Sequence, residues 1–297
     1  MSDTALAPSL RQPDPERPTS QRPASQRPAS QRWGLATIGF QSTTAGLAGL
    51  ALFLLAAPTI IVVAVSFTSG LSLRFPPPGL SLRWYESLAN SWQLQFAARN
   101  SLIVGVIATG LAVMLGVPAA LAIGRSQSRM GRALDQLFLS PLILPGLAFG
   151  LASLIFFTSI GLTVSITTLV IGHTVVSVPY VVRNTIAALA QLDPAQIDSS
   201  LSLGASRLMT FRRVTLPSIR SGILSGAFIC FMASFDNIPV SLFLRDAATD
   251  MLPVRMWQDL EGRLDVTIAA ASSALIILTI ILALIMERLV GLSRRLQ

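Results

Sequence analysis

The chain has 297 residues, of which 52% are hydrophobic and only 12% are charged, and its mean hydropathy is +0.64. Soluble proteins carry about 25% charged residues, so this composition excludes an ordinary soluble protein and predicts an all-α protein with several membrane spans. The formal charge of +8 comes from 22 arginines without a lysine, which excludes a lysine-dependent phosphate-binding loop. With one cysteine, Cys230, and one histidine, His173, the chain has neither an intrachain disulfide nor a multi-histidine metal site.

The first residues are polar and repetitive, with R-P-T-S-Q and R-P-A-S-Q units at a five-residue period between Arg17 and Gln31. Such sequence cannot bury enough apolar surface to become ordered. We therefore expect a disordered cytoplasmic tail over residues 1–40, able to touch membrane lipid. The apolar run Thr44–Phe67 is longer than the core of a signal peptide and reaches the ~20 helical residues of a membrane span.

Five further apolar stretches complete a predicted six-span domain over residues 44–290. They are Ala98–Ile123, Leu134–Phe157, Leu162–Ala188, Ile219–Leu244 and Val266–Met286. Pro141, Pro145 and Pro179 interrupt the third and fourth spans, and the backbone groups that they leave unpaired favour helices facing the bundle interior. Small residues on the second span suit close helix contact, namely Gly105, Gly110 and Gly116.

The placement of arginine predicts how the spans are oriented. If both termini are cytoplasmic, 16 arginines lie in the inner segments and 6 in the outer segments, and the balance is 13 to 6 without the three remote tail arginines. Inner loops of membrane proteins carry the excess of basic residues. The basic excess therefore reflects topology, and we expect no nucleic-acid partner. The segment that joins the fourth and fifth spans lies in the cytoplasm in this orientation.

That segment, Asp193–Pro217, is a polar, arginine-bearing interruption between two apolar blocks. Asp193 is a good helix N-cap, Pro194 suits the first helical position, and Gln196 falls at the capping-box position. These residues predict a short helix. The segment has an apolar face formed by Leu201, Leu208 and Phe211. Its basic residues, Arg207, Arg212 and Arg213, keep it at a membrane surface or on an acidic partner.

A turn and a second helix follow in the prediction. The first helix is expected to stop near Leu203, because Gly204 can adopt the left-handed conformation that ends helices. The second helix is expected to run from about Ser206 to Val214. Pro217 is expected to end it, since proline disfavours helical geometry in the preceding residue, and to open the next helix.

The same segment resembles the cytoplasmic signature of ABC importer permeases, E-A-A-x3-G-x9-I-x-L-P, a helix-turn-helix that docks in a groove of the ATPase subunit. In an alignment on Gly204, an aspartate stands at the glutamate position, two serines replace the alanines, and the final Leu-Pro matches outright. The resemblance implies that the ATPase-coupling residues are Asp198, Ser199, Ser200, Gly204, Ala205, Arg207, Val214, Leu216 and Pro217. The alternative is an ordinary amphipathic cytoplasmic loop.

Asp236 is the most informative single charge, because S-F-D-N-I-P places it within the fifth apolar block. A carboxylate inside a membrane is costly and usually faces a cavity or a partner. One alternative is that Asp236 is a cation-attracting group in a translocation path, with Phe235, Asn237 and Tyr180 in that path. The other is that it pairs with an arginine such as Arg183 or lies near the outer interface.

Most of the chain after the tail, including S-F-D-N-I-P-V-S-L-F-L and M-L-P-V-R-M-W-Q-D-L, resembles the permeases of polyamine-type (spermidine/putrescine) ABC importers. The resemblance implies the type I importer permease (MetI-like) fold in a bacterial inner membrane. It also implies a second permease subunit, two ATPase subunits that hydrolyse ATP, and a periplasmic solute-binding protein. The chain itself is then a transport subunit without catalytic residues, cofactor or metal. Related permeases for ferric iron or phosphonates share this architecture.

Other interpretations remain open. An ion-gradient-driven secondary transporter needs no ATPase. A rhomboid-like protease fits poorly, because Gly222–Gly226 has one residue too many between its glycine and serine. His173 is either part of a proton relay or a hydrogen-bonded structural histidine. The acidic outer loop 245–265 either helps to dock an extracytoplasmic partner or is simply solvated.

Overall fold

The computed structural model describes residues 35–126, 128–263 and 265–295, and the chain divides after Ala57 into two compact units. Helix α1 (Leu35–Ser66) begins before residue 40, where the tail was expected to end. The rest of the predicted tail, residues 1–34, lies outside the described residues. The second unit starts at Pro58 and holds the other described helices, including every site discussed below.

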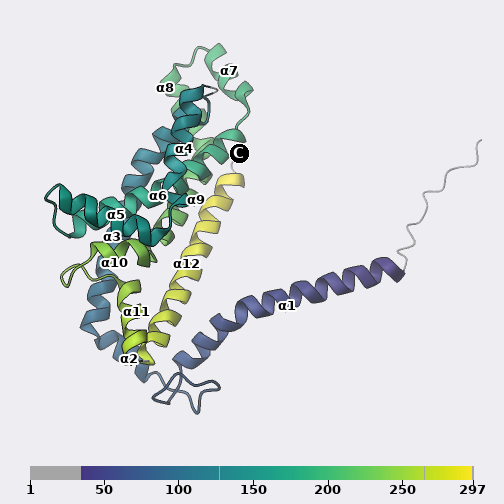
Figure 1. Cartoon of the computed structure of the whole chain (residues 1–297). Coiled ribbons are helices and arrows are strands. Elements are labelled where there is room, and N and C mark those ends of the chain that lie inside the picture. Colours follow the sequence, from purple (N-terminus) through teal and green to yellow (C-terminus); the bar gives the residue numbers. More distant parts are fainter. Residues whose placement is uncertain (1–34, 127, 264, 296–297) are drawn as a thin grey trace, which may run out of the picture. The chain divides into compact units, whose positions relative to one another are not determined.

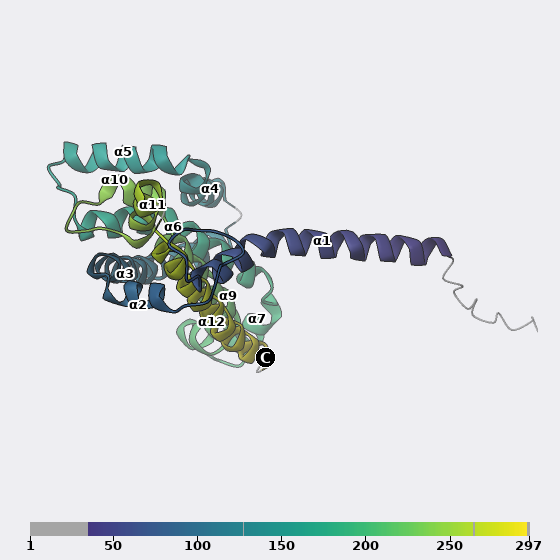
Figure 2. The same cartoon turned by 90° about the horizontal axis from the view of Figure 1, so that it is seen from below.

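The described part of the second unit is helical (Figures 1 and 2). Its helices after α1 are α2 (Arg83–Asn90), α3 (Trp92–Ile123), α4 (Arg129–Ile143), α5 (Gly146–Ser159), α6 (Ile166–Ala190), α7 (Pro194–Ser202), α8 (Arg207–Thr210), the π-turn η1 (Phe211–Thr215), α9 (Leu216–Phe235), α10 (Ile238–Leu244), α11 (Leu252–Arg263) and α12 (Thr267–Arg295). Among the described residues of the chain, five helical stretches are long and apolar enough to cross a membrane: Phe40–Ser66, Trp92–Ile123, Ile166–Ala190, Arg207–Phe235 and Thr267–Gly291. A sixth crossing requires α4 and α5 to be counted together.

The third predicted span is not one helix, because α4 and α5 meet at an angle of 103°. Leu144 is extended, with φ −74° and ψ 139°, as expected for a residue that precedes a proline. Helices of 15 and 14 residues each extend only roughly 22 Å, less than the ~30 Å of a hydrocarbon core. The predicted span Leu134–Phe157 thus corresponds to two helices, α4 and α5, and Pro145, one of its two predicted helix breakers, is the reason for the bend.

The fifth predicted span is also interrupted. Helix α9 ends at Phe235, and Asn237 leaves the helical conformation with φ −84° and ψ 89°. The Asn237 side chain then accepts a hydrogen bond of 2.9 Å from the amide of Val240, which caps α10. Asp236 consequently lies at a break between two helices, and not inside one long helix as predicted. We call residues 236–237 the α9–α10 break.

Helix α6 is the central element of the second unit. In the most apolar 18-residue segment of α6, 61% of the residues are buried, against 28% or less in the corresponding segments of the other spanning stretches. It packs against both α3 and α9. On α9, a Cβ at Gly222 would lie 2.6 Å from the Asn184 carbonyl oxygen, and one at Gly226 would lie 3.0 Å from the Val181 Cα. The two glycines that suggested a protease motif therefore serve close helix packing.

Two of the three glycines singled out on α3 also lie at close helix contacts, and the third does not. A Cβ at Gly105 would lie 3.1 Å from Phe231, and one at Gly116 would lie 3.1 Å from Val181. Gly110 faces open space, so its predicted role in helix contact is wrong. Cys230 is fully buried between α3, α6 and α9, which agrees with a packing role.

We predict that Gly222→Ala lowers the Tm of the purified protein in detergent. The added methyl group would overlap the Asn184 carbonyl and the Ala188 side chain, and such overpacking costs about 1–3 kcal/mol. Gly110→Ala is the matched control, because it introduces the same methyl group where nothing lies within 4 Å. Equal Tm values for the two variants would contradict the close packing of α6 and α9.

Candidate functional site

A helical hairpin, α7 followed by α8, stands at one end of the second unit (Figure 1). Its turn has the conformation that the sequence predicted, with Gly204 at φ +83°. The amide of Gly204 donates to the Leu201 carbonyl at 2.9 Å, and the amide of Ala205 donates to the Ser200 carbonyl at 3.2 Å. This pair of bonds is the Schellman motif, which requires a left-handed residue at the position of Gly204. The predicted left-handed conformation of Gly204 is confirmed.

Side-chain caps define where both helices of the hairpin begin. Asp193 accepts a hydrogen bond of 2.9 Å from the Ala195 amide, as predicted for the first helix. The capping box is not formed, because no bond returns from the Gln196 side chain to the Asp193 backbone among the described residues. Ser206 caps the second helix by accepting from the Met209 amide at 3.2 Å. Side-chain chemistry, then, sets both helix starts.

Pro217 does not end the second helix, contrary to the prediction. Helix α8 continues through η1 into α9, so Arg207–Phe235 forms one helical stretch. In η1 the Leu216 amide donates to the Phe211 carbonyl five residues earlier. This wider turn accommodates a proline, which has no amide to donate and whose ring needs room at the preceding turn. The hairpin is consequently joined to α9 without a loop.

Four of the nine predicted coupling residues line one hollow of about 680 Å³ between the two arms of the hairpin: Ser199, Ser200, Ala205 and Val214. Asp198 and Arg207 are exposed beside it. The hydroxyl of Ser200 lies 3.0 Å from that of Thr210 and so links α7 to α8. Ser200 stands where the family signature has alanine. Thr210, which is buried, was missed because no signature position marks it.

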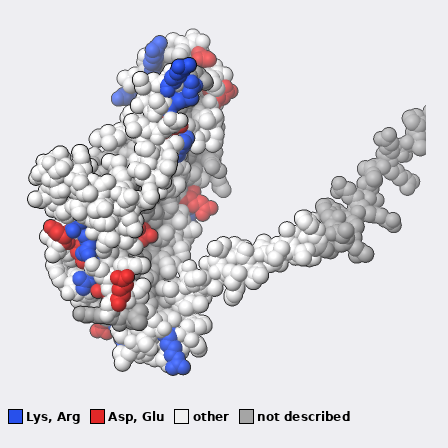
Figure 3. Space-filling model, viewed as in Figure 1, with Lys and Arg blue, Asp and Glu red and all other residues white. Residues whose placement is uncertain are grey.

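The hairpin surface is both apolar and basic. Leu203 and Leu208 are 88% and 60% exposed, and Leu203 was absent from the predicted apolar face. Basic side chains gather at this end of the second unit (Figure 3), and they include Arg207 and Arg212. Such a surface is compatible with both predicted settings, a membrane surface and an acidic partner.

A small cavity of about 160 Å³ lies where the two helix breaks of the unit approach each other. Its lining includes Tyr180 and Asn237 from the predicted path, together with Gly146 at the start of α5. A Cβ at Gly146 would lie 3.0 Å from Pro239 of α10, and both views show α5 beside α10 (Figures 1 and 2). The structure therefore brings two of the four predicted path residues together.

Asp236 is exposed at the α9–α10 break, and no partner of its carboxylate occurs among the described residues. Arg183, the alternative partner, lies 3.6 Å from Asp135 of α4 instead. Phe235 turns away from the cavity: its ring centroid lies 5.7 Å from that of Phe231, and it packs on a cluster of α3 and α11 residues. Phe235 thus has a packing role.

His173 is fully buried in α6. Its Nδ1 lies 2.9 Å from the Ser234 hydroxyl and its Nε2 lies 3.1 Å from the Ser241 hydroxyl. Both ring nitrogens are thus occupied, as expected for the structural alternative. A rhomboid-like pairing with Ser225 is not formed. Within the described chain, no group of three or more His, Cys, Asp or Glu could hold a metal ion.

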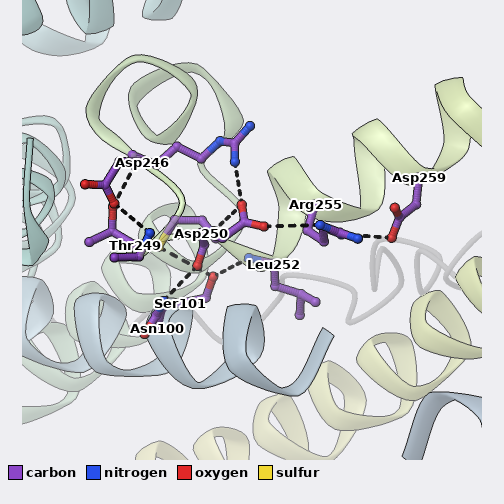
Figure 4. A network of polar contacts seen from close by, with 11 residues as sticks. Asn100, Ser101, Asp246, Thr249, Asp250, Leu252, Arg255 and Asp259 are labelled. Atoms are coloured by element: carbon purple, nitrogen blue, oxygen red, sulfur yellow. Dashed lines mark hydrogen bonds and ion pairs between the residues drawn. The ribbon is translucent and has the colours of Figure 1, made fainter. Parts of the chain in front are cut away.

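An ion network connects the loop between α10 and α11 to α11 itself (Figure 4), in the half of the second unit away from the hairpin (Figure 1). Asp250 accepts a bond of 2.7 Å from Arg245 and lies 3.8 Å from Arg255, which in turn bonds Asp259 at 3.2 Å. These side chains are only 13–27% exposed. Their charges are consequently screened less than those of an open loop.

Backbone contacts fasten the same loop to α3. The Asn100 side chain donates to the Asp250 carbonyl at 3.0 Å, and the Leu252 amide donates to the Ser101 hydroxyl at 2.9 Å (Figure 4). The outer loop was left open as either a docking element or a solvated loop. The structure shows that its middle is fixed to α3 and that its second half forms α11, so the segment is ordered whichever of the two roles it has.

We predict that Asp250→Asn lowers the Tm of the purified protein more than Asp259→Asn does. Loss of the Asp250 charge weakens the pairing of two arginines, and a desolvated charged group without its partner costs about 1–3 kcal/mol or more. Asp259 contacts Arg255 alone, so it is the matched control. A Tm loss that is equal or reversed between the variants would contradict this order.

Comparison with known proteins places this geometry among permeases. A family model described as a binding-protein-dependent transport system inner membrane component matches residues 112–296. The spermidine/putrescine transport system permease protein PotC of Haemophilus influenzae is 27% identical over 233 residues, which cover 77% of this chain and 89% of that protein. The putrescine transport system permease protein PotI of Escherichia coli K12 is 28% identical, with coverage of 67% and 73%. A probable molybdenum ABC transporter permease of Haloferax volcanii is 32% identical, with coverage of 54% and 62%.

Solved structures show the same fold. The methionine ABC transporter MetNI in inward-facing conformations matches with a TM-score of 0.57 and 17% identity, covering 68% of this chain and 96% of that one. A bacterial alginate ABC transporter, solved with an alginate pentasaccharide-bound periplasmic protein, matches with a TM-score of 0.60 and 19% identity, covering 89% and 98%. The predicted all-α permease fold is confirmed.

Proposed function

This chain belongs to the family of binding-protein-dependent transport system inner membrane components, and we propose that it forms half of the translocation path of an ATP-driven polyamine importer. It is a transport subunit. In the proposed complex it pairs with a second permease, two ATPase subunits hydrolyse ATP, and a periplasmic binding protein delivers the solute. The absence of lysine supports separate ATPase subunits, since a Walker A loop requires one. The complex lies in a bacterial inner membrane, with both termini of this chain in the cytoplasm.

One observation supports this function above the others, namely the unbroken helix from the hairpin to Asp236. Arg207–Phe235 has 29 residues and extends roughly 44 Å, which exceeds the thickness of a hydrocarbon core. Closure of the ATPases on ATP would move the docked hairpins of the two permeases together. Because no loop separates α8 from α9, the movement is transmitted to the α9–α10 break, where the path opens to the outside.

The α9–α10 break also supports a cationic solute. The Asp236 carboxylate is exposed and has no partner among the described residues, so an ammonium group can approach it. Tyr180 and Asn237 line the neighbouring cavity, and an aromatic ring face attracts cations. The relatives PotC and PotI are named as permeases of spermidine and putrescine systems. In the assembled complex we expect Asp236 to face the interface with the second permease.

An importer for another solute is the second candidate. The molybdenum permease relative favours it, since that protein is 32% identical to the chain. An unpaired carboxylate repels oxyanions such as phosphonates, however, so Asp236 favours a cation, whether polyamine or ferric iron. The ion-gradient-driven alternative is set aside because the family depends on a binding protein.

We predict that Gly204→Val uncouples ATP hydrolysis from uptake or prevents assembly with the ATPase. A Cβ at Gly204 would meet nothing within 4 Å, so the expected loss comes from the positive φ alone, at roughly 1–2 kcal/mol for a β-branched residue. Gly204→Asn is the matched control, because asparagine tolerates this conformation. Uptake and co-purification with the ATPase are measured for both. Normal uptake and assembly in the valine variant would refute the coupling role of the turn.

We predict that Asp236→Asn lowers putrescine uptake roughly tenfold in proteoliposomes with saturating binding protein, while the complex still assembles. A tenfold loss corresponds to about 1.4 kcal/mol, a reasonable value for one partly screened charge attraction. Glu261→Gln is the control, because it removes an exposed carboxylate from α11. Normal uptake by the Asp236 variant would remove this residue from the path.

A further inference from the structure

His173 joins α6 to both sides of the α9–α10 break. Ser234 is the second-last residue of α9 and Ser241 lies in α10, and the imidazole bonds one hydroxyl with each nitrogen, at 2.9 and 3.1 Å. The exposed fractions of the three side chains are 0% for His173, 1% for Ser234 and 0% for Ser241. No solvent reaches these bonds, so breaking them would leave buried polar groups without partners.

The break has few connections of its own. Its backbone bonds are local, from the Asn237 amide to the Ser234 carbonyl at 3.3 Å and from the Ile238 amide to the Asp236 carbonyl at 3.1 Å. Helix α6 is pressed closely against α10, because a Cβ at Gly172 would lie 2.6 Å from Leu244. A Cβ at Gly150 of α5 would also lie only 2.6 Å from the Pro239 carbonyl oxygen, so α10 is held by α5 as well. The angle between α9 and α10 is thus maintained by the contacts of α10 with α5 and α6, and by the two bonds of His173, more than by the break itself.

We propose that His173 is a positioning residue that fixes the α9–α10 break and thereby holds Asp236 in the translocation path. The proposal rests on the function given above. A neutral imidazole offers one donor and one acceptor, and a serine hydroxyl takes either role, so both bonds form together without a buried charge. With both helices held to α6, movement that arrives along α9 shifts Asp236 and is not lost by bending at the break.

Substitutions can remove the two bonds separately. The amide of asparagine reaches about as far as Nδ1, so His173→Asn retains contact with Ser234 only. Glutamine reaches about as far as Nε2, so His173→Gln retains contact with Ser241 only, and His173→Phe keeps a ring without either bond. Thr174→Val is the matched control, because Thr174 is buried beside His173 and its side chain bonds only the Val170 carbonyl of its own helix.

The position of the break is measured by thiol labelling of the assembled transporter. Cys230 is the only cysteine of this chain and is buried, so Cys230→Ala with Asp236→Cys leaves a single thiol in this chain, whose labelling is followed on the separated subunit. We expect His173→Phe to change the rate of labelling by a water-soluble maleimide at least fivefold, the Asn and Gln variants to change it less, and Thr174→Val to leave it unaltered. An unaltered rate in assembled His173→Phe would overturn the proposal.

Two further measurements keep the test decisive. If His173→Phe does not assemble, Ser234→Ala is combined with His173→Asn and, separately, with His173→Gln. It should alter the labelling rate in the Asn variant, which still bonds Ser234, and have no effect in the Gln variant, which does not. Equal effects in both backgrounds would overturn the proposal. With native Asp236, uptake per ATP hydrolysed should fall in the His173 variants. Altered labelling with normal uptake would support the positioning role of His173 and contradict the path role of Asp236.

Discussion

The close contact between α6 and the interrupted helix α9–α10 is the constraint on which the rest of this permease depends. It combines glycines that bring the backbones together with one buried imidazole that satisfies two hydroxyls. Apolar side chains gain nothing by leaving lipid for protein, so helices in a membrane associate through packing and hydrogen bonds of this kind. The contact explains why a helix break is tolerated next to the exposed Asp236 carboxylate.

The π-turn η1 connects the hairpin to α9 without a loop. A proline placed just after the hairpin would ordinarily separate it from the following span. Here the wider turn accommodates the proline, so α8, η1 and α9 form one continuous helical stretch. The Schellman turn at Gly204 sets the direction of the other arm, and the Ser200–Thr210 bond holds the two arms together.

The hairpin and the α10–α11 loop differ in whether their charged and apolar side chains have partners within the described chain. At the hairpin end, exposed leucines and arginines form a surface that lacks a complement within the described chain. In the half of the unit away from the hairpin, acidic and basic side chains neutralise one another across the loop between α10 and α11, and α3 anchors that loop. The hairpin surface is consequently suited to a partner, whereas the charged groups of the α10–α11 loop are paired within the chain.

The sequence by itself determined the membrane class, the hairpin caps, the left-handed turn at Gly204 and the family, because composition, capping chemistry and backbone sterics act over a few residues. It marked Pro145 as an interruption but could not give the 103° bend there, the interruption at Asn237 or the continuation through Pro217, since hydropathy does not report helix direction. Only the tertiary structure decided that His173 bonds Ser234 and Ser241, which lie 61 and 68 residues further along the chain. The same holds for Arg183 and Asp135, because the partner of a polar side chain depends on which helices the whole bundle brings together.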